Sequence, residues 1–111
     1  MRHTLAATAL ALCTTITPCS ASENTDIALK LTVMASFVDS SCVRMAPDYN
    51  MIREAFRLLG VSTDELKTRP RLAQGSLLTN AMKRNVKASC DEAWRMFGTD
   101  GSVIPGMVTK R

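Results

Sequence analysis

Histidine is almost absent from this 111-residue chain, which holds a single one at position 3. Beyond that position no Ser-His-Asp or Cys-His catalytic arrangement can form, and zinc ligation through histidine is excluded as well. The sequence also lacks a phosphate-binding P-loop, a dinucleotide-binding glycine pattern and a calcium-binding loop. We therefore expect no cofactor, no metal site and none of the common catalytic sites.

Aromatic residues and long apolar runs are scarce too. The chain has one Trp, one Tyr and three Phe, too few for the stacking platforms with which proteins hold single-stranded nucleic acids. A helix that crosses a bilayer needs ~20 apolar residues in succession, and no segment reaches that length. The sequence thus predicts no nucleic-acid partner and no transmembrane segment in the mature chain.

What the N-terminus does have is the pattern of a secretory signal peptide. Arg2 supplies a positive charge, residues 4–17 are rich in Ala, Leu and Thr, and Cys19-Ser20-Ala21 place small residues at a cleavage site. We predict that residues 1–21 are removed by cleavage between Ala21 and Ser22, and that the protein reaches the bacterial periplasm or is secreted. Lipidation of Cys19 is the alternative, and the bulky ring of Pro18 before it disfavours this.

The remaining segment, residues 22–111, has the size of one small domain. Removal of residues 1–21 takes away one of the 14 basic residues and none of the 10 acidic ones. That leaves 13 basic against 10 acidic residues, a net charge of +3. We expect a single all-α domain of about four helices, because the apolar residues recur with helical spacing throughout.

The first two helices follow from apolar stripes. A stripe over residues 25–41 predicts the first helix and comprises Ile27, Leu31, Met34, Val38 and Cys42. A stripe over residues 47–59 predicts the second and comprises Ile52, Ala55, Phe56 and Leu59. Pro47 suits the first turn of that second helix, and Gly60 suits its C-cap.

Two further helices are predicted beyond Gly60. Residues 62–65, Ser-Thr-Asp-Glu, form a capping box that opens a short third helix, which Pro70 ends or kinks into the next. The fourth helix is the longest, over residues 71–97, with Gly98 as its stop. Gly75 near its start costs about 1 kcal/mol relative to Ala. The apolar stripe of this helix comprises Leu78, Met82, Val86, Cys90, Ala93, Trp94 and Phe97.

Export leaves two cysteines, Cys42 and Cys90, in an oxidising compartment, where we expect them to form a structural disulfide. Both fall on apolar stripes, so the bridge should join the end of the first helix to the middle of the fourth inside the core. Residues 99–111 begin with an Asp-Gly turn and continue as an extended, largely apolar tail. We expect this tail to fold back over the bundle, although it could remain free to add to a partner.

Carboxylates are the only catalytic groups left. Asp64-Glu65 and Asp91-Glu92 are adjacent pairs, and neighbouring residues of a helix point about 100° apart and do not converge. The first pair is explained by its place in a helix's first turn and the second by exposure to solvent. We therefore predict no catalytic residues and no enzyme, with a small carboxylate-dependent enzyme as the remote alternative.

Basic residues and methionines provide the candidate binding surface. The basic residues Lys67, Arg69 and Arg71 cluster at the junction of the third and fourth helices, and Lys83, Arg84 and Lys87 lie on the polar side of the fourth. Met34 and Met82 are expected in the core. The other methionines fall off the stripes and could line an exposed apolar groove: Met45, Met51, Met96 and Met107. Trp94 is predicted to pack beside Cys90.

Size, export signal and the spacing of Cys42 and Cys90 resemble the small periplasmic acid-stress chaperones of the HdeA type. The resemblance implies a helical domain with one disulfide, and a dimer that loosens in acid and shields unfolding client proteins. The net positive charge departs from it. Small periplasmic immunity proteins, which block an incoming cell-wall hydrolase, share the same general description.

These observations together predict a small exported protein that has no catalytic activity and binds another protein in the bacterial periplasm, as an inhibitor, immunity protein or adaptor. The predicted contact residues are Lys67, Arg69 and Arg71 together with Ile104 and Met107 of the tail. An acid-stress chaperone is the alternative, and a homodimer is compatible with either role. The chaperone should expose more apolar surface as pH falls, whereas an inhibitor should keep a rigid surface and one tight partner at neutral pH.

Overall fold

A computed structural model describes residues 21–111 of the chain. The signal peptide predicted for residues 1–21 and the lipidation site considered at Cys19 lie outside this part, apart from Ala21. The elements in chain order are α2 (Ala21–Ser41), β1 (Met45–Pro47), α3 (Tyr49–Leu59), the 3-10 helix η1 (Thr63–Leu66), α4 (Arg69–Lys83), α5 (Val86–Phe97) and β2 (Val108–Lys110). The predicted all-α fold with one disulfide is confirmed, and none of the described helices is long and apolar enough to cross a membrane.

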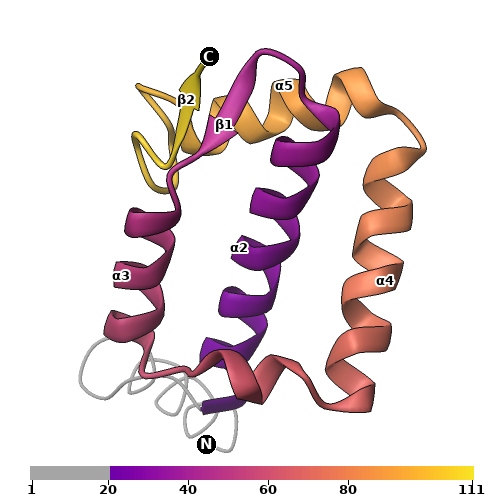
Figure 1. Cartoon of the computed structure of the whole chain (residues 1–111), viewed down its shortest axis with the longest axis vertical. Helices are drawn as coiled ribbons and strands as arrows, with labels where there is room; N and C mark the ends of the chain where they lie inside the picture. The colour runs from indigo at the N-terminus through magenta and orange to yellow at the C-terminus, as the bar shows by residue number, and fades with distance from the viewer. Residues whose placement is uncertain (1–20) are drawn as a thin grey trace, which may run out of the picture.

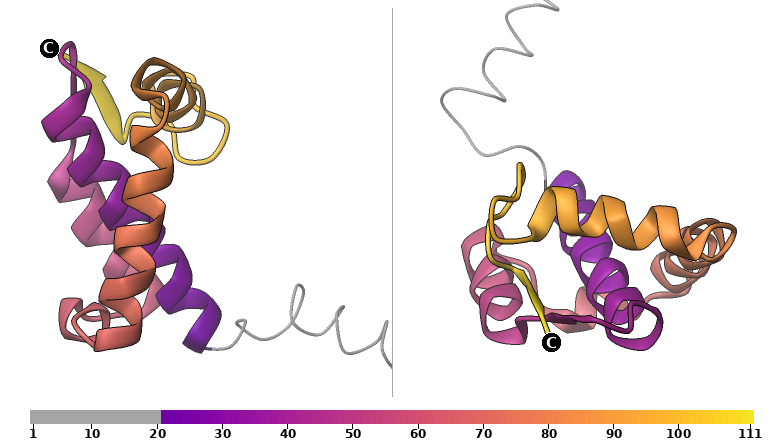
Figure 2. Two further views of the ribbon diagram at one scale, coloured as in Figure 1. Left: turned by 90° about the vertical axis from the view of Figure 1, so that its right-hand side faces the viewer. Right: turned by 90° about the horizontal axis from the view of Figure 1, so that it is seen from above.

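The helices form an open layer around α2. Helices α3 and α4 flank α2 on opposite sides, and η1 joins them at the lower end of the layer (Figure 1). Helix α5 crosses one face of this layer near the C-terminal end of α2 (Figure 2). Because α2 has neighbours on several sides, it supplies the centre of the core.

The apolar stripe predicted for the first helix is confirmed for Leu31, Met34, Val38 and Cys42, which are buried, but it is too narrow. Ile27, which the stripe includes, is 46% exposed. Buried residues that the stripe omits lie elsewhere around the helix: Ala28, Leu29, Val33, Ala35 and Phe37. A helix that is apolar almost all round is typical of a central position, because a single stripe suits only a helix with one packing partner. The helix also begins four residues earlier than predicted, at Ala21.

Helix α3 matches its predicted face but begins later than expected. Asp48 is its N-cap and accepts hydrogen bonds from the backbone N–H groups of Asn50 and Met51 at 3.0 and 3.2 Å. Pro47, predicted inside this helix, belongs instead to β1. Ile52 and Phe56 are buried as predicted. Gly60 ends the helix with φ of +71°, the left-handed conformation that favours glycine.

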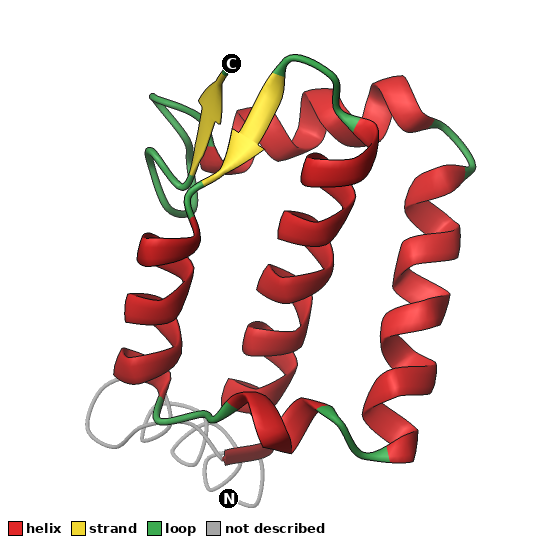
Figure 3. Cartoon of the chain, viewed as in Figure 1, coloured by secondary structure: helices red, strands yellow, loops and turns green. Residues whose placement is uncertain are grey.

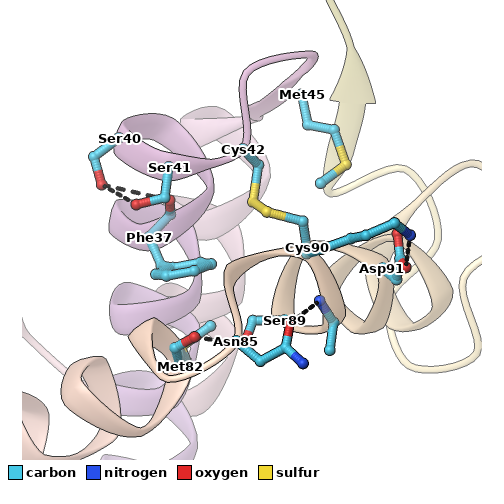
Figure 4. Close-up of a disulfide and its surroundings, with 12 residues drawn as sticks. Phe37, Ser40, Ser41, Cys42, Met45, Met82, Asn85, Ser89, Cys90 and Asp91 are labelled. Carbon is cyan, nitrogen blue, oxygen red and sulfur yellow. Dashed lines mark hydrogen bonds and ion pairs between the residues drawn. A yellow bond between two sulfur atoms is a disulfide. The ribbon is translucent and has the colours of Figure 1, made fainter.

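The long fourth helix predicted over residues 71–97 is two helices. The chain turns between Lys83 and Val86, where Asn85 caps α5 by accepting a hydrogen bond from the Ala88 N–H at 3.1 Å. The Ser89 hydroxyl donates to the carbonyl oxygen of Met82 at 2.8 Å and satisfies the end of α4 (Figure 4). Two short polar side chains thus stabilise a turn through which the apolar periodicity continues. Pro70 stands in the first turn of α4 rather than ending the preceding helix.

The C-terminal segment is docked against the bundle. Strand β2 pairs antiparallel with β1, with Pro47 opposite Val108 and Met45 opposite Lys110 (Figure 3). Met107 and Val108 are almost completely buried, and the Asp48 N–H donates to the Met107 carbonyl oxygen at 2.8 Å. Strand β1 was not expected from the sequence, because it is only three residues long and consists of Met, Ala and Pro.

The predicted disulfide joins Cys42, directly after α2, to Cys90 in α5 (Figure 4). The two Cα atoms are 5.7 Å apart, within the usual range for a disulfide. Cys42 is buried, whereas Cys90 is half-buried at the edge of the core. The bridge therefore fixes α5 across the end of the central helix.

We expect opposite effects on stability when Gly60 and Gly75 are each changed to alanine. Gly60 has positive φ with no atom within 4 Å of an added Cβ, so Gly60→Ala should lower the free energy of unfolding by about 1 kcal/mol through backbone strain alone. Gly75 is inside α4, where an added Cβ would meet Leu29 and Val33 at ordinary contact distances of 3.5 and 3.6 Å. Gly75→Ala should raise the free energy of unfolding by about 0.5–1 kcal/mol. Urea denaturation of both variants and of the wild type measures the two changes. If both variants were destabilised, or both stabilised, the explanation given for these glycines would be wrong.

Candidate partner-binding groove

Helix α4 is the least buried helix of the described chain and has no fully buried residue. In helical projection the polar residues Ser76, Thr79 and Lys83 lie on one side, together with the exposed Leu72. The opposite side carries a band of apolar residues that begins where α4 contacts α2 and extends around the helix toward solvent. In this order the band comprises Met82, Leu78, Ala81, Leu77 and Ala73. Leu77 is 71% exposed. Leu78 and Met82 are partly buried against the core, and the rest of this band is exposed.

This band borders an apolar groove of about 660 Å³ walled by α2, α4 and α5, which we call the α4 groove. Three methionines line it, Met34 from α2, Met82 from α4 and Met96 from α5. Phe97 and Ala93 contribute further apolar surface from α5. Ile27 and Val103 are exposed residues of the lining and leave the groove open to solvent.

Two ionisable side chains line the groove, Lys30 of α2 and Glu92 of α5. Glu92 forms an ion pair with Arg95, and the hydrogen bond from that guanidinium holds the pKa of the Glu92 carboxyl below its ordinary value. Lys30 is exposed and makes no ion pair within the described residues. The positive charge of Lys30 at the edge of the groove is therefore outside any ion pair, and it interacts with the Asp26 carboxylate only at longer range.

An ion pair between Arg71 and Asp26 ties the N-terminal part of α4 to α2. The Arg71 guanidinium also donates to the Gln74 side-chain oxygen at 3.1 Å, and only 19% of its side chain is exposed. The hydrogen bond from Arg71 holds the pKa of the Asp26 carboxyl below its ordinary value of 3.8, against a smaller opposing effect of burial. The charges of Arg71 and Lys30 lower that pKa further. Asp26 therefore stays ionised in mild acid.

The lowered pKa of Asp26 predicts how the ion pair responds to acid. Because the pKa is lower in the folded state, ionised Asp26 stabilises the fold fully above the unfolded pKa of about 3.9, and this contribution is lost as pH falls through the folded value. Asp26→Asn should lower the melting temperature at pH 7, and the difference from the wild type should shrink below pH 4. Circular dichroism melts at pH 7, 5 and 3 measure it.

The matched control for this experiment is Asp64→Asn. Asp64 pairs with Lys67 at 3.7 Å on an exposed surface, where an ion pair contributes little to stability. This variant should melt close to the wild type at every pH. A difference between Asp26→Asn and the wild type that stays constant from pH 7 to pH 3 would contradict a stabilising role for the ionised carboxylate.

The structure separates the contact residues predicted from the sequence. Arg71 is held by Asp26, Lys67 pairs with Asp64, and Arg69 is exposed at the start of α4 without an ion pair to any described residue. Ile104 is partly buried against the core, and Met107 is only 1% exposed, so the tail offers little free apolar surface there. Of the three basic residues predicted to contact a partner, Arg69 and Lys67 are the more accessible.

The methionines are distributed differently from the prediction. Met34 is buried as expected, and Met82 packs against the core and also lines the groove. Met45 and Met107 were expected at an exposed groove but are core residues, because β1 and the C-terminal segment fold over the end of the bundle. Met96 is the off-stripe methionine that does line the α4 groove. Trp94 is half-buried, with the Lys110 ammonium 4.6 Å from its ring centroid.

The exposed apolar residues of α4 were missed, although the sequence carries a signal for them. Leu77 and Leu78 are neighbours, so they cannot both face α2. Together with Ala73 and Ala81 on a helical wheel, they form an apolar band that is wider than packing against one helix requires.

The other hollows of the described residues are more polar. Hollows of about 480 and 590 Å³ lie between α2 and α3 and between α2 and α4, on the opposite side of α2 from the groove. Both are lined by the hydroxyl groups of Thr32, Ser36 and Thr63. Within residues 21–111 no group of three or more Cys, Asp or Glu side chains lies close enough to hold a metal ion. The α4 groove is thus more apolar than either of these two hollows.

The adjacent carboxylates do not form a shared site in the structure. Asp91 pairs with Lys87 at 2.9 Å and Glu92 pairs with Arg95, so each carboxylate forms an ion pair with a basic residue of its own helix. No family model, curated protein or solved structure matches the chain.

Proposed function

We propose that this chain is a small exported protein without catalytic activity that binds another protein in the bacterial periplasm, as an inhibitor, immunity protein or adaptor. The observation that carries the proposal is the α4 groove, an apolar and methionine-lined surface beside a helix with no fully buried residue. Flexible methionine side chains suit protein-binding surfaces, since they adapt to the shape of a partner. The disulfide supports an oxidising compartment for this role.

A capture experiment with a groove variant tests the proposal. The oxidised protein, residues 22–111, is immobilised and exposed to periplasmic extract at pH 7, and bound species are quantified by mass spectrometry. Ile27→Gln with Val103→Gln removes apolar contact at the open edge of the groove without adding charge. We expect the wild type to retain one partner in stoichiometric amount and this variant to lose it.

Leu58→Gln is the matched control, because Leu58 is 72% exposed on α3 and does not line the groove. It should retain the partner as the wild type does. Retention of the same partner by the groove variant, or an empty eluate from the wild type, would contradict the proposed function. Circular dichroism melts confirm that each variant is folded.

An acid-stress chaperone is the second candidate, and the Asp26–Arg71 pair favours it. Protonation of Asp26 at low pH would remove a link between α4 and α2, next to the apolar surface of the groove. This candidate predicts that many unrelated proteins are captured near pH 3 and none at pH 7. One partner held at pH 7 alone would exclude it.

A further inference from the structure

The α4 groove is lined by one basic residue, Lys30, and one acidic residue, Glu92, which is paired with Arg95. Helix α4 carries Arg69, Arg71 and Lys83 and no acidic residue. Arg84 follows in the turn between Met82 and Ala88, which both line the groove. Lys30 and Arg84 form no ion pair within residues 21–111, whereas Arg71 pairs with Asp26 and Lys83 lines the hollow on the other side of α4. Within the described chain, Lys30 and Arg84 therefore leave positive charge at the edge of the groove.

This charge argues against a second copy of the chain as the occupant. Packing of α4 against α4 of a twofold-related copy would bring Arg69 and Arg84 of each chain near the same cations of the other. Like charges brought together at an interface are destabilising, and no carboxylate of α4 is present to offset them. An occupant with acidic groups has the complementary charge.

The walls of the groove determine the conformation of the occupant. All three walls are helices, whose backbone N–H and C=O groups are already bonded within each helix. An extended peptide would therefore bury its own backbone groups without partners, because the groove offers no strand edge. A helix satisfies its own backbone and can insert apolar side chains spaced by three and four residues. A lipid surface is a less suitable occupant, since the apolar surface is concave between helices rather than a protruding helix face.

We propose that the occupant of the α4 groove is an amphipathic α-helix of another protein, with an apolar face that packs against Met34, Met82 and Met96 and with acidic side chains that meet Lys30 and Arg84. This inference rests on the proposed function and names the kind of partner. It assigns the groove methionines to apolar contact and the two cations to orientation and selectivity.

Designed peptides and methionine methyl NMR test this inference. One peptide of about 16 residues carries leucines at helical spacing flanked by Glu, a second has the same leucines with every Glu replaced by Lys, and a third is a scrambled form of the first. The protein, residues 22–111, is labelled with ¹³C at the methionine methyl groups. We expect the Glu peptide to shift the methyl signals of Met34, Met82 and Met96. Met45 and Met107, buried outside the groove lining, serve as internal controls and should not move.

Charge selectivity is read from the dissociation constants. We expect the Glu peptide to bind at least about tenfold more tightly than the Lys peptide in low salt, since a few ion pairs of modest strength change sign between them. Lys30→Glu with Arg84→Glu should reverse this preference. Arg44→Glu with Arg53→Glu changes the net charge by the same amount at residues outside the groove and should keep the preference for the Glu peptide.

The results distinguish this inference from the proposed function. Equal binding of the Glu and Lys peptides, or a preference that the Arg44 and Arg53 variant also reverses, would overturn the acidic helix. So would methyl shifts caused by phosphatidylglycerol vesicles and by none of the peptides, which would indicate a membrane surface. In these cases the proposed function stands if the capture experiment still finds a partner that depends on the groove. The proposed function itself is contradicted if the wild type retains no partner, or if the groove variant retains the same partner as the wild type.

Discussion

Replacing Cys42 and Cys90 together by alanine is expected to lower the free energy of unfolding by about 4 kcal/mol. The bridge closes a loop with a sequence separation of 48 residues, and the loss of loop-closure entropy from the unfolded chain predicts this magnitude. A domain of this size has a total stability of about 5–13 kcal/mol, so a large share of it depends on one covalent bond. Urea denaturation of the wild type and the double variant, followed by far-UV circular dichroism, measures the difference.

The same comparison with and without a reducing agent serves as the control. Reduction should destabilise the wild type by a similar amount and leave the double variant unchanged. A loss below about 1 kcal/mol in the double variant would show that packing of α5 across α2 holds these helices without the bridge.

The second large effect is expected at Phe37, near the disulfide (Figure 4). Its side chain is 2% exposed and belongs to the central helix α2. Phe37→Ala should lower the free energy of unfolding by about 3–5 kcal/mol, because it removes a large buried ring and leaves a cavity that the surrounding helices fill only partly. Urea denaturation measures this change, with fluorescence of the single tryptophan as a second probe.

Leu58→Ala is the matched control for Phe37→Ala, since it also shortens a large apolar side chain of a helix. Leu58 is largely exposed on α3, and its truncation should change the stability by less than about 0.5 kcal/mol. A similar loss of stability in both variants would mean that the effect of truncation does not depend on how deeply the side chain is buried.

The sequence was informative where one local signal determines the structure. Gly60 and the apolar face of Ile52 and Phe56 specify α3 and its end, and the spacing of two cysteines sufficed to predict the bridge. The division between α4 and α5 could not be predicted in this way. It depends on Asn85 and Ser89, which cap the two helix ends, while the apolar periodicity runs through the turn without interruption.

The candidate site was only partly accessible from the sequence. Its basic residues and the use of methionine were recognised, but their arrangement depends on long-range contacts. The pairing of Asp26 with Arg71 spans 45 residues, and β1 forms only because β2 returns from the far end of the chain. Neither contact leaves a local pattern, so Arg71 was expected at a free surface and Met107 at a binding surface. The groove itself arises because α4 packs on α2 through one side only.

The methionine lining of the α4 groove also makes this surface open to chemical change. Oxidants such as hydrogen peroxide convert a thioether to a sulfoxide, which is polar and chiral, and this change disrupts methionine-rich interfaces. Met82 and Met96 are only partly buried, whereas Met107 is shielded at 1% exposure, so oxygen transfer should begin at the groove and spare the core. Peroxide would then weaken the proposed binding of an apolar helix while the fold persists, and a methionine sulfoxide reductase would restore this surface.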